Sequence, residues 1–192
     1  VFDGKANKPY KEKSTKNPLN VYGKTKLDGE RSIQKILSQN SIIIRTSGMY
    51  SEFSNNFVDK ILIIGREQKE IKIVCDQIVS TTYASDLAEA IITIINSKKF
   101  SKDNQKAQIF HYSSNDEVSW YDFAKEVFEL SNIKLKIHPT KLNEFSTIVK
   151  RPIYSVLDTD KIVLDYNVKT FDWKNSIKKL FASEIFINKL EI

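Results

Sequence analysis

The chain has 192 residues, of which 41% are hydrophobic and 28% charged, so it can bury one sizeable core and does not have the composition of a disordered protein. A single cysteine, Cys75, excludes an intrachain disulfide, and the apolar runs are too short to span a bilayer. The net charge of +6 comes mostly from lysines interleaved with acids, which argues against a nucleic-acid surface. We expect a soluble, cytoplasmic protein.

The first third of the chain predicts a helix followed by a buried strand. Pro18 precedes a segment, residues 19–39, with apolar residues on one side and no internal proline, which predicts a long helix. The β-branched run over residues 41–46 is typical of a buried parallel strand. A helix over 55–68 and an alternating strand over 71–74 follow. Cys75 then falls at the end of this strand, and a buried, inert thiol is its expected state.

The remaining elements continue the alternation. Ser85 precedes an acid and an apolar run, which predicts a serine-capped helix ending at Ile95. A strand over 109–112, a helix over 119–131 and a last amphipathic helix over 172–186 complete the pattern. Strands alternating with helices indicate an α/β fold.

One pair of residues has the chemistry of a proton donor. Tyr22 and Lys26 are four residues apart, so both project from the same face of the first predicted helix. A lysine beside a tyrosine favours the phenolate form and makes the phenol a plausible acid. The spacing alone is weak evidence, because Tyr121 and Lys125 repeat it.

The surrounding residues distinguish the two pairs. Tyr22 lies in the run Pro18-Leu19-Asn20-Val21-Tyr22-Gly23-Lys24-Thr25-Lys26, and the other ordered matches are Pro9-Tyr10, Arg45-Thr46-Ser47-Gly48-Met49-Tyr50, Asn55-Asn56-Phe57, Asp76-Gln77, Trp120-Tyr121-Asp122-Phe123 and Arg151-Pro152. This series resembles the dTDP-4-dehydrorhamnose reductase family, a branch of the extended short-chain dehydrogenases/reductases. The resemblance covers nearly the whole chain and is weakest after about residue 155.

The resemblance implies an α/β fold with a Rossmann-like parallel sheet and a smaller α/β substrate-binding part. It assigns residues 1–50 and 71–113 to the NAD(P)-binding domain, and residues 51–70 and 114–192 to the substrate-binding part. The chain has five glycines and no G-x-G-x-x-G turn. We therefore expect the first strands of that domain and its glycine-rich turn to lie outside this chain. Residues 1–192 alone should then bind dinucleotide weakly and be inactive.

The resemblance also implies a reaction and a site. Tyr22 would donate a proton to the 4-keto group of a nucleotide-linked deoxysugar, as in dTDP-L-rhamnose synthesis, while NADPH or NADH delivers hydride. Lys26 would hold the nicotinamide ribose, and Thr46 and Ser47 would border the cofactor. Gly48, Asn55, Asn56 and Arg151 are the implied substrate contacts. Gly48 replaces a tryptophan common in the family, so we expect a more open sugar pocket.

Three further expectations concern partners and alternatives. His111 and His138 have no acidic or cysteine neighbours at ligand spacing, so no metal site is predicted. The substrate is the expected partner, with no nucleic acid and no membrane, and the family allows a homodimer. The alternatives are a non-catalytic regulatory subunit on the same fold, similar to the β subunit of methionine adenosyltransferase, or a nucleotide-sugar epimerase or dehydratase.

Overall fold

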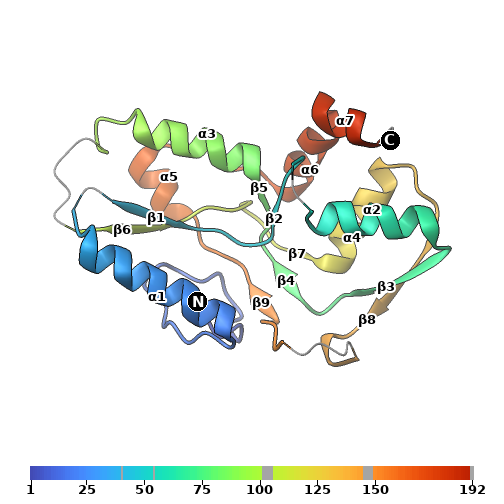
Figure 1. The fold of residues 1–192 in the computed structure, drawn as a ribbon, viewed down its shortest axis with the longest axis horizontal. Helices are drawn as coiled ribbons and strands as arrows, with labels where there is room; N and C mark the ends of the chain where they lie inside the picture. Colours follow the sequence, from blue (N-terminus) through green and yellow to red (C-terminus); the bar gives the residue numbers. More distant parts are fainter. Residues whose placement is uncertain (40, 54, 101–105, 145–148, 191–192) are drawn as a thin grey trace.

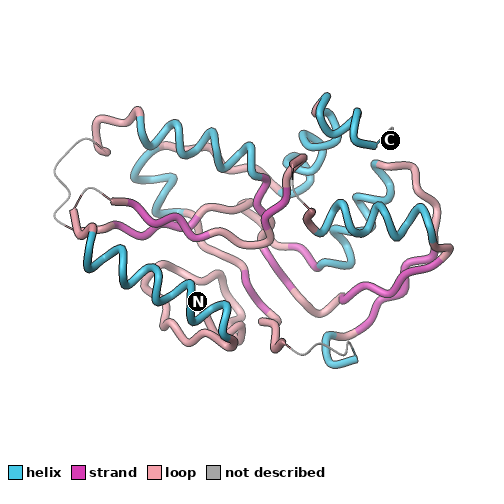
Figure 2. The backbone as a smooth tube through the Cα atoms, in the orientation of Figure 1, coloured by secondary structure: helices cyan, strands magenta, loops and turns pink. Residues whose placement is uncertain are grey.

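The computed structural model describes residues 1–39, 41–53, 55–100, 106–144 and 149–190, whose fold is drawn in Figures 1 and 2. The helices are α1 (Val21–Ile36), α2 (Phe57–Glu67), α3 (Ala84–Ile95), α4 (Trp120–Leu130), α5 (Asp160–Tyr166), α6 (Trp173–Ala182) and α7 (Glu184–Leu190), with a 3-10 turn at Leu142–Glu144. The strands are β1 (Ile42–Arg45), β2 (Met49–Tyr50), β3 (Glu70–Val74), β4 (Ile78–Val79), β5 (Thr82–Tyr83), β6 (Gln108–His111), β7 (Val118–Ser119), β8 (Lys136–Thr140) and β9 (Tyr154–Ser155).

One lobe is built on the parallel pair β1–β6, which is in register from Ile42 with Gln108 to Arg45 with His111. Figure 1 shows α1 on one side of this pair and α3 and α5 on the other. Alternate residues of a strand point to opposite faces, so β1 divides its side chains between two environments. Ile42 and Ile44 pack into an apolar cluster with Phe110 of β6 and residues of α3 and α5. Arg45 ends the strand and forms an ion pair with Glu30 of α1.

The second lobe surrounds a larger apolar cluster formed by α2, β3, α4, α6 and α7, with Val58, Phe123, Val127, Ile177 and Phe186 at its centre. β3 pairs with β8 in parallel from Glu70 with Lys136 to Val74 with Thr140. Ile73 of β3 belongs to this cluster. The predicted division into an NAD(P)-binding domain and a substrate-binding part stays a prediction.

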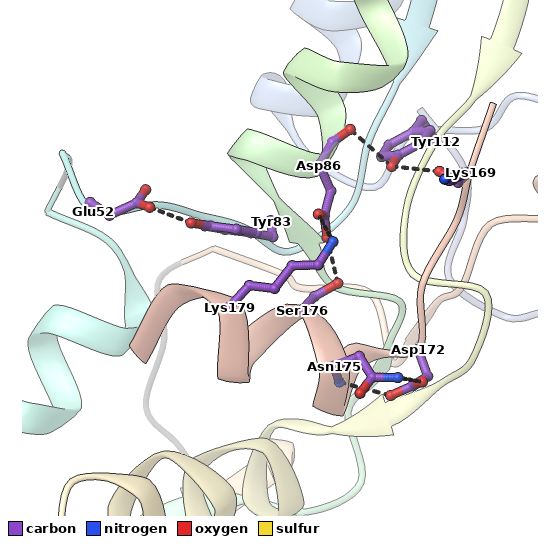
Figure 3. Close-up of polar contacts among 9 residues, drawn as sticks. All are labelled: Glu52, Tyr83, Asp86, Tyr112, Lys169, Asp172, Asn175, Ser176 and Lys179. Carbon is purple, nitrogen blue, oxygen red and sulfur yellow. Dashed lines mark hydrogen bonds and ion pairs between the residues drawn. The ribbon is translucent and has the colours of Figure 1, made fainter. Parts of the chain in front are cut away.

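A buried polar cluster joins the two lobes (Figure 3). Asp86, at the start of α3 and 4% exposed, accepts hydrogen bonds from Ser176 Oγ at 2.6 Å and Lys179 Nζ at 2.7 Å, both on α6. Tyr112 Oη lies 3.0 Å from the main-chain carbonyl oxygens of both Asp86 and Lys169. Burying a carboxylate is costly unless it is paired, and here the partners come from the other lobe. The cluster therefore fixes α3 against α6.

The α/β, Rossmann-like fold predicted from the sequence is confirmed. Three details differ. α3 begins one residue before Ser85, with Tyr83 at the N-cap and no side-chain cap, so the predicted serine cap is wrong. The last predicted helix is two helices, α6 and α7, because Ser183 between them is extended. Strands β2, β4, β5, β7, β8 and β9 and helix α5 were not predicted. No helix among the described residues is long and apolar enough to cross a membrane.

Candidate active site

The start of α1 is fixed by its sequence, which sets the position of Tyr22. Asn20 is the N-cap, and its side chain accepts a hydrogen bond from the Gly23 amide at 2.8 Å. The Asn20 amide group also donates to the Lys150 carbonyl oxygen at 2.9 Å, across 130 residues of sequence. A Cβ atom at Gly23 would lie 2.8 Å from Pro18 Cβ, so the glycine permits close packing of the helix on the preceding loop.

Tyr22 and Lys26 project from the same face of α1, as their spacing predicts. Lys26 Nζ lies 5.4 Å from the centre of the Tyr22 ring, and the tyrosine is 69% exposed. The pair Tyr121 and Lys125 on α4 has nearly the same geometry, with 5.5 Å between the ammonium nitrogen and the ring centre. The geometry within each pair therefore does not distinguish the two. Only the residues around each pair can do so.

The loop after β1 brings Thr46 and Ser47 beside α1. The Ser47 carbonyl oxygen accepts a hydrogen bond from Thr82 Oγ1 at 2.7 Å, and the Gly48 carbonyl oxygen accepts one from the Thr82 amide at 3.2 Å. These bonds, with the β2–β5 pairing, hold the backbone that leaves the carboxyl end of β1. In α/β proteins, ligands bind at this end of parallel strands.

A cavity of about 590 Å³ brings the predicted catalytic and cofactor-binding residues together. Its lining includes Tyr22 and Lys26 from α1 with Thr46 and Ser47 from the end of β1. Met49, Pro152, Tyr154 and Ser155 also line it. An exposed phenol and an ammonium group beside two hydroxyl groups suit a polar ligand with an accessible carbonyl, and the volume is in the range of small-molecule sites.

Gly48 is not among the residues that line this cavity, although its neighbours Ser47 and Met49 are. Its φ angle is +51°, and a Cβ atom there would lie 3.4 Å from both Thr81 Cα and the Trp120 ring. A left-handed backbone favours glycine, so any larger residue at position 48 is strained whatever space is available. The substrate contact expected of Gly48 stays a prediction.

Two of the three other predicted substrate contacts line a second cavity, of about 450 Å³. Asn56 and Arg151 border it together with Phe57, Lys60, Lys72 and Trp120. The Asn56 side chain also caps α2, accepting from the Val58 amide at 2.9 Å and donating to the Ser51 carbonyl oxygen at 2.8 Å. Asn55 is exposed and does not line the cavity.

Two consecutive residues of the chain line the two cavities. Arg151 lines the second and Pro152 lines the first. Gln77, which also lines the second cavity, donates a hydrogen bond to the Pro152 carbonyl oxygen at 2.9 Å and holds this segment in place. A single elongated ligand with a polar linker is the kind of molecule that two adjacent cavities accommodate.

A buried ionic cluster at the wall of the first cavity was missed from the sequence: Glu30 and Arg45 line the cavity, and His111 lies behind them. Arg45 of β1 is 8% exposed and forms two hydrogen bonds of 2.7 Å with the Glu30 carboxylate on α1. His111, with no exposed surface, lies 3.2 Å from Arg45 Nη1 through its Nε2 atom. Burial, and next the Arg45 charge, lower the pKa of His111 to about 4. Arg45 at the end of an apolar strand was the one available signal, because a buried charge requires a partner.

No group of three or more His, Cys, Asp or Glu residues suited to holding a metal occurs in the part of the chain that the structure describes. Cys75 is a free, half-buried thiol directly after β3.

The β1–β6 pair with helices on both faces, and a polar cavity at the carboxyl end of β1, define an α/β protein of the Rossmann-like class. Residues 1–185 match the model of the RmlD substrate binding domain, and the chain belongs to that family.

Relatives of known sequence and structure agree with this assignment. The chain is 36% identical over 189 residues to the dTDP-4-dehydrorhamnose reductase of Aggregatibacter actinomycetemcomitans, covering 95% of this chain and 63% of the relative. A dTDP-4-dehydrorhamnose reductase from Clostridium acetobutylicum superposes with a TM-score of 0.85 at 35% identity, covering 100% of this chain and 63% of that one. The dTDP-4-dehydrorhamnose reductase from Bacillus anthracis, solved in complex with NADP, superposes with a TM-score of 0.86 at 31% identity, covering 95% of this chain and 62% of that one. The chain thus spans less than two thirds of these proteins.

Proposed function

We propose that the protein is an NAD(P)H-dependent reductase that acts on the 4-keto group of a nucleotide-linked deoxysugar of the dTDP-4-dehydrorhamnose type. The observation that carries the proposal is the single cavity shared by Tyr22, Lys26, Thr46 and Ser47. Tyr121 and Lys125 have the same mutual geometry, but the cavity near Lys125 is lined by Glu117, Glu126 and Glu129. Those carboxylates would repel the phosphates of both a dinucleotide and a nucleotide sugar.

The residues of the first cavity fit a nicotinamide cofactor, which supplies hydride when it is bound. Lys26 has the reach and charge to hold ribose hydroxyl groups, and Thr46 and Ser47 offer hydroxyl groups at the end of β1. Tyr22 gives its phenolic proton to the ketone oxygen as the C4 carbon is reduced. The Lys26 ammonium group stabilises the negative charge that develops on the phenol oxygen as that proton leaves.

We further propose that the second cavity takes the nucleotide end of the substrate. The Phe57 and Trp120 rings, with centres 4.4 Å apart, offer an aromatic surface for a base. Arg151, Lys60 and Lys72 supply positive charge for a diphosphate, and arginine can bind phosphate bidentately. Because Arg151 and Pro152 line adjacent cavities, a diphosphate held at Arg151 would direct the sugar toward Tyr22.

The test is a pair of matched substitutions in the intact protein. Tyr22→Phe removes the transferable proton and keeps the ring, so kcat for NADPH-dependent reduction of dTDP-4-dehydrorhamnose should fall by on the order of 10²–10⁴. Tyr121→Phe, made in the other Tyr-x-x-x-Lys pair, should leave kcat unchanged. Near wild-type turnover by Tyr22→Phe would remove Tyr22 from the mechanism.

The same assay separates the alternatives. A regulatory subunit would bind NADPH and turn over no sugar substrate. An epimerase or dehydratase would convert a nucleotide sugar without net consumption of NADPH. For the nucleotide end, Arg151→Ala should raise KM by about tenfold with little change in kcat, while Lys150→Ala, in the same segment but in neither cavity, should change neither.

A further inference from the structure

The helix that carries Tyr22 and Lys26 is held to the sheet by few buried residues. Only Gly23, Leu27 and Glu30 of α1 are buried among the described residues. Gly23 has no side chain, and Leu27 makes an apolar contact that does not fix direction. Glu30 is therefore the one buried side chain of α1 that can set both the rotation of the helix and its position along the sheet.

The partner of Glu30 is rigidly placed. Glu30 receives two hydrogen bonds of 2.7 Å from Arg45, whose Nε and Nη2 atoms form a planar fork. Arg45 ends β1 and directly precedes Thr46 and Ser47. The bidentate pair thus joins the helix of the proposed proton donor to the strand that presents the proposed cofactor contacts.

His111 holds the other side of the guanidinium group. Arg45 has no acceptor, so the contact of 3.2 Å requires that His111 Nε2 accepts a hydrogen bond from Arg45 Nη1. His111 Nδ1 must then carry the proton, which it donates to the Tyr10 carbonyl oxygen at 3.0 Å. The His111 amide donates to Glu12 Oε1 at 3.1 Å, and the Phe2 ring centre lies 5.3 Å from Arg45 Cζ. The Arg45 fork is fixed from several directions.

We propose that Glu30, Arg45 and His111 are positioning residues that hold Tyr22 and Lys26 in reacting geometry relative to Thr46 and Ser47. This inference rests on the proposed function of the first cavity. A buried ion pair contributes little net stability compared with a well-packed apolar pair. Its role here is therefore to fix the orientation of α1 relative to β1. Displacement of a reacting group by about 1 Å can lower a rate by about 100-fold.

The decisive variant replaces the pair by apolar residues of similar size, Glu30→Leu with Arg45→Met. Such a replacement often preserves stability. It removes the oriented hydrogen bonds between α1 and β1 while both positions stay buried. The expected result is a fall in kcat on the order of 10–100-fold, with KM for the nucleotide sugar changed less than about twofold, because the nucleotide cavity is untouched. The control is Asp28→Asn with Arg31→Gln, which removes an exposed ion pair on the same helix and should change neither constant.

A second readout does not depend on turnover. Amide hydrogen exchange over residues 21–36, measured without cofactor, should be faster in the Leu/Met variant than in the wild type and unchanged in the control. Wild-type kcat in the Leu/Met variant would overturn the proposal, whatever the exchange data show. If the double variant does not fold, Arg45→Lys decides: it keeps the charge and loses the fork, so kcat should still fall by about tenfold with KM retained. Wild-type kcat in Arg45→Lys would equally overturn it.

The outcomes also separate this inference from the proposed function. If Tyr22→Phe is inactive and the Leu/Met variant keeps wild-type kcat, the positioning role fails and the reductase assignment stands. If Tyr22→Phe is fully active, the assignment itself fails, whatever the exchange data show.

Discussion

Acidification should destabilise this protein through His111. The imidazole is fully buried and faces the Arg45 guanidinium group. Burial and the arginine charge lower the pKa of His111 to about 4, whereas in the unfolded chain it is about 6.5. Between these values the unfolded state binds more protons than the folded state, so the free energy of unfolding rises with pH. The stabilisation is complete above about pH 6.5 and is lost as the pH falls toward 4.

The magnitude follows from the two pKa values. The full difference corresponds to about 3 kcal/mol, and most of it should already be lost at about pH 4.5 relative to pH 7. Carboxylates titrate over the same range, so the wild-type curve alone does not isolate the histidine. The informative quantity is the difference between the wild type and His111→Gln. Its amide can still accept from Arg45 and donate to Tyr10, and it does not titrate.

The assay is urea unfolding of the intact protein at a series of pH values from 7.5 to 4.5. The free energy of unfolding of the wild type should fall by about 2 to 3 kcal/mol more than that of His111→Gln over this range. His138→Gln, which removes the second, half-exposed histidine on β8, should follow the wild type. Parallel curves for wild type and His111→Gln would refute the assignment of a buried, neutral imidazole held against Arg45.

Three further predictions concern stability and are tested by urea unfolding near pH 7. Gly65→Ala should lower the free energy of unfolding by about 1–3 kcal/mol, because its Cβ would lie 2.6 Å from Phe128 Cε1. Gly29→Ala on α1, with nothing within 4 Å, should raise it by up to about 1 kcal/mol. Equal effects would contradict the packing of α2 on α4. Asp86→Ala should cost about 1–3 kcal/mol by leaving Ser176 and Lys179 without their acceptor, while Lys174→Ala in a more exposed pair should cost less than about 1 kcal/mol. Gly48→Val should be less stable than Gly48→Asn by about 1–2 kcal/mol, since asparagine tolerates a left-handed backbone and valine does not; equal stability would mean that residue 48 is not held in that conformation.

The elements predicted well from the sequence are those with a sustained period. α1, α2 and α4 each have a run of apolar residues long enough to show its spacing, and β1 was predicted from its continuous β-branched run. Ser119 caps α4, because its hydroxyl oxygen accepts a hydrogen bond from the Asp122 amide at 3.0 Å. The strands that were missed are mostly two residues long and have no period to read. β8 contains Pro139 and exposed polar residues, so its pairing with β3 comes from tertiary contacts rather than local preference.

The split between α6 and α7 shows the same limit. Ser183 adopts an extended conformation without a neighbouring glycine or proline to signal the end of a helix. Both helices turn their apolar residues into one cluster, with Ile177 and Phe186 fully buried, and a break at Ser183 allows this where one straight helix would not. Packing of the whole core, rather than the local sequence, sets the boundary.

The candidate site divides in a similar way. Tyr22 and Lys26 could be read from spacing and context because they lie on one helix. The ion pair between Glu30 and Arg45 joins residues 15 apart, and the contact of Arg45 with His111 spans 66 residues. Sequence spacing carries no information about such contacts. The charge of Arg45 at the end of a buried strand predicts that a partner exists, and only the fold identifies it.

Under the proposed function, different elements of the fold bind the two ends of the substrate. α1 and the end of β1 line the cavity where reduction would occur, while α2 and β3 line the cavity with the aromatic pair and the cations. The segment at Arg151 and Pro152 connects them, and the Asp86 cluster fixes α3 against α6 across the lobes. A substrate anchored by its nucleotide would therefore meet Tyr22 at a distance set by polar contacts that are already made in the folded chain. Because these contacts are already in place, little conformational entropy is lost at the reacting end when substrate binds. Small displacements of the reacting groups there lower the rate most.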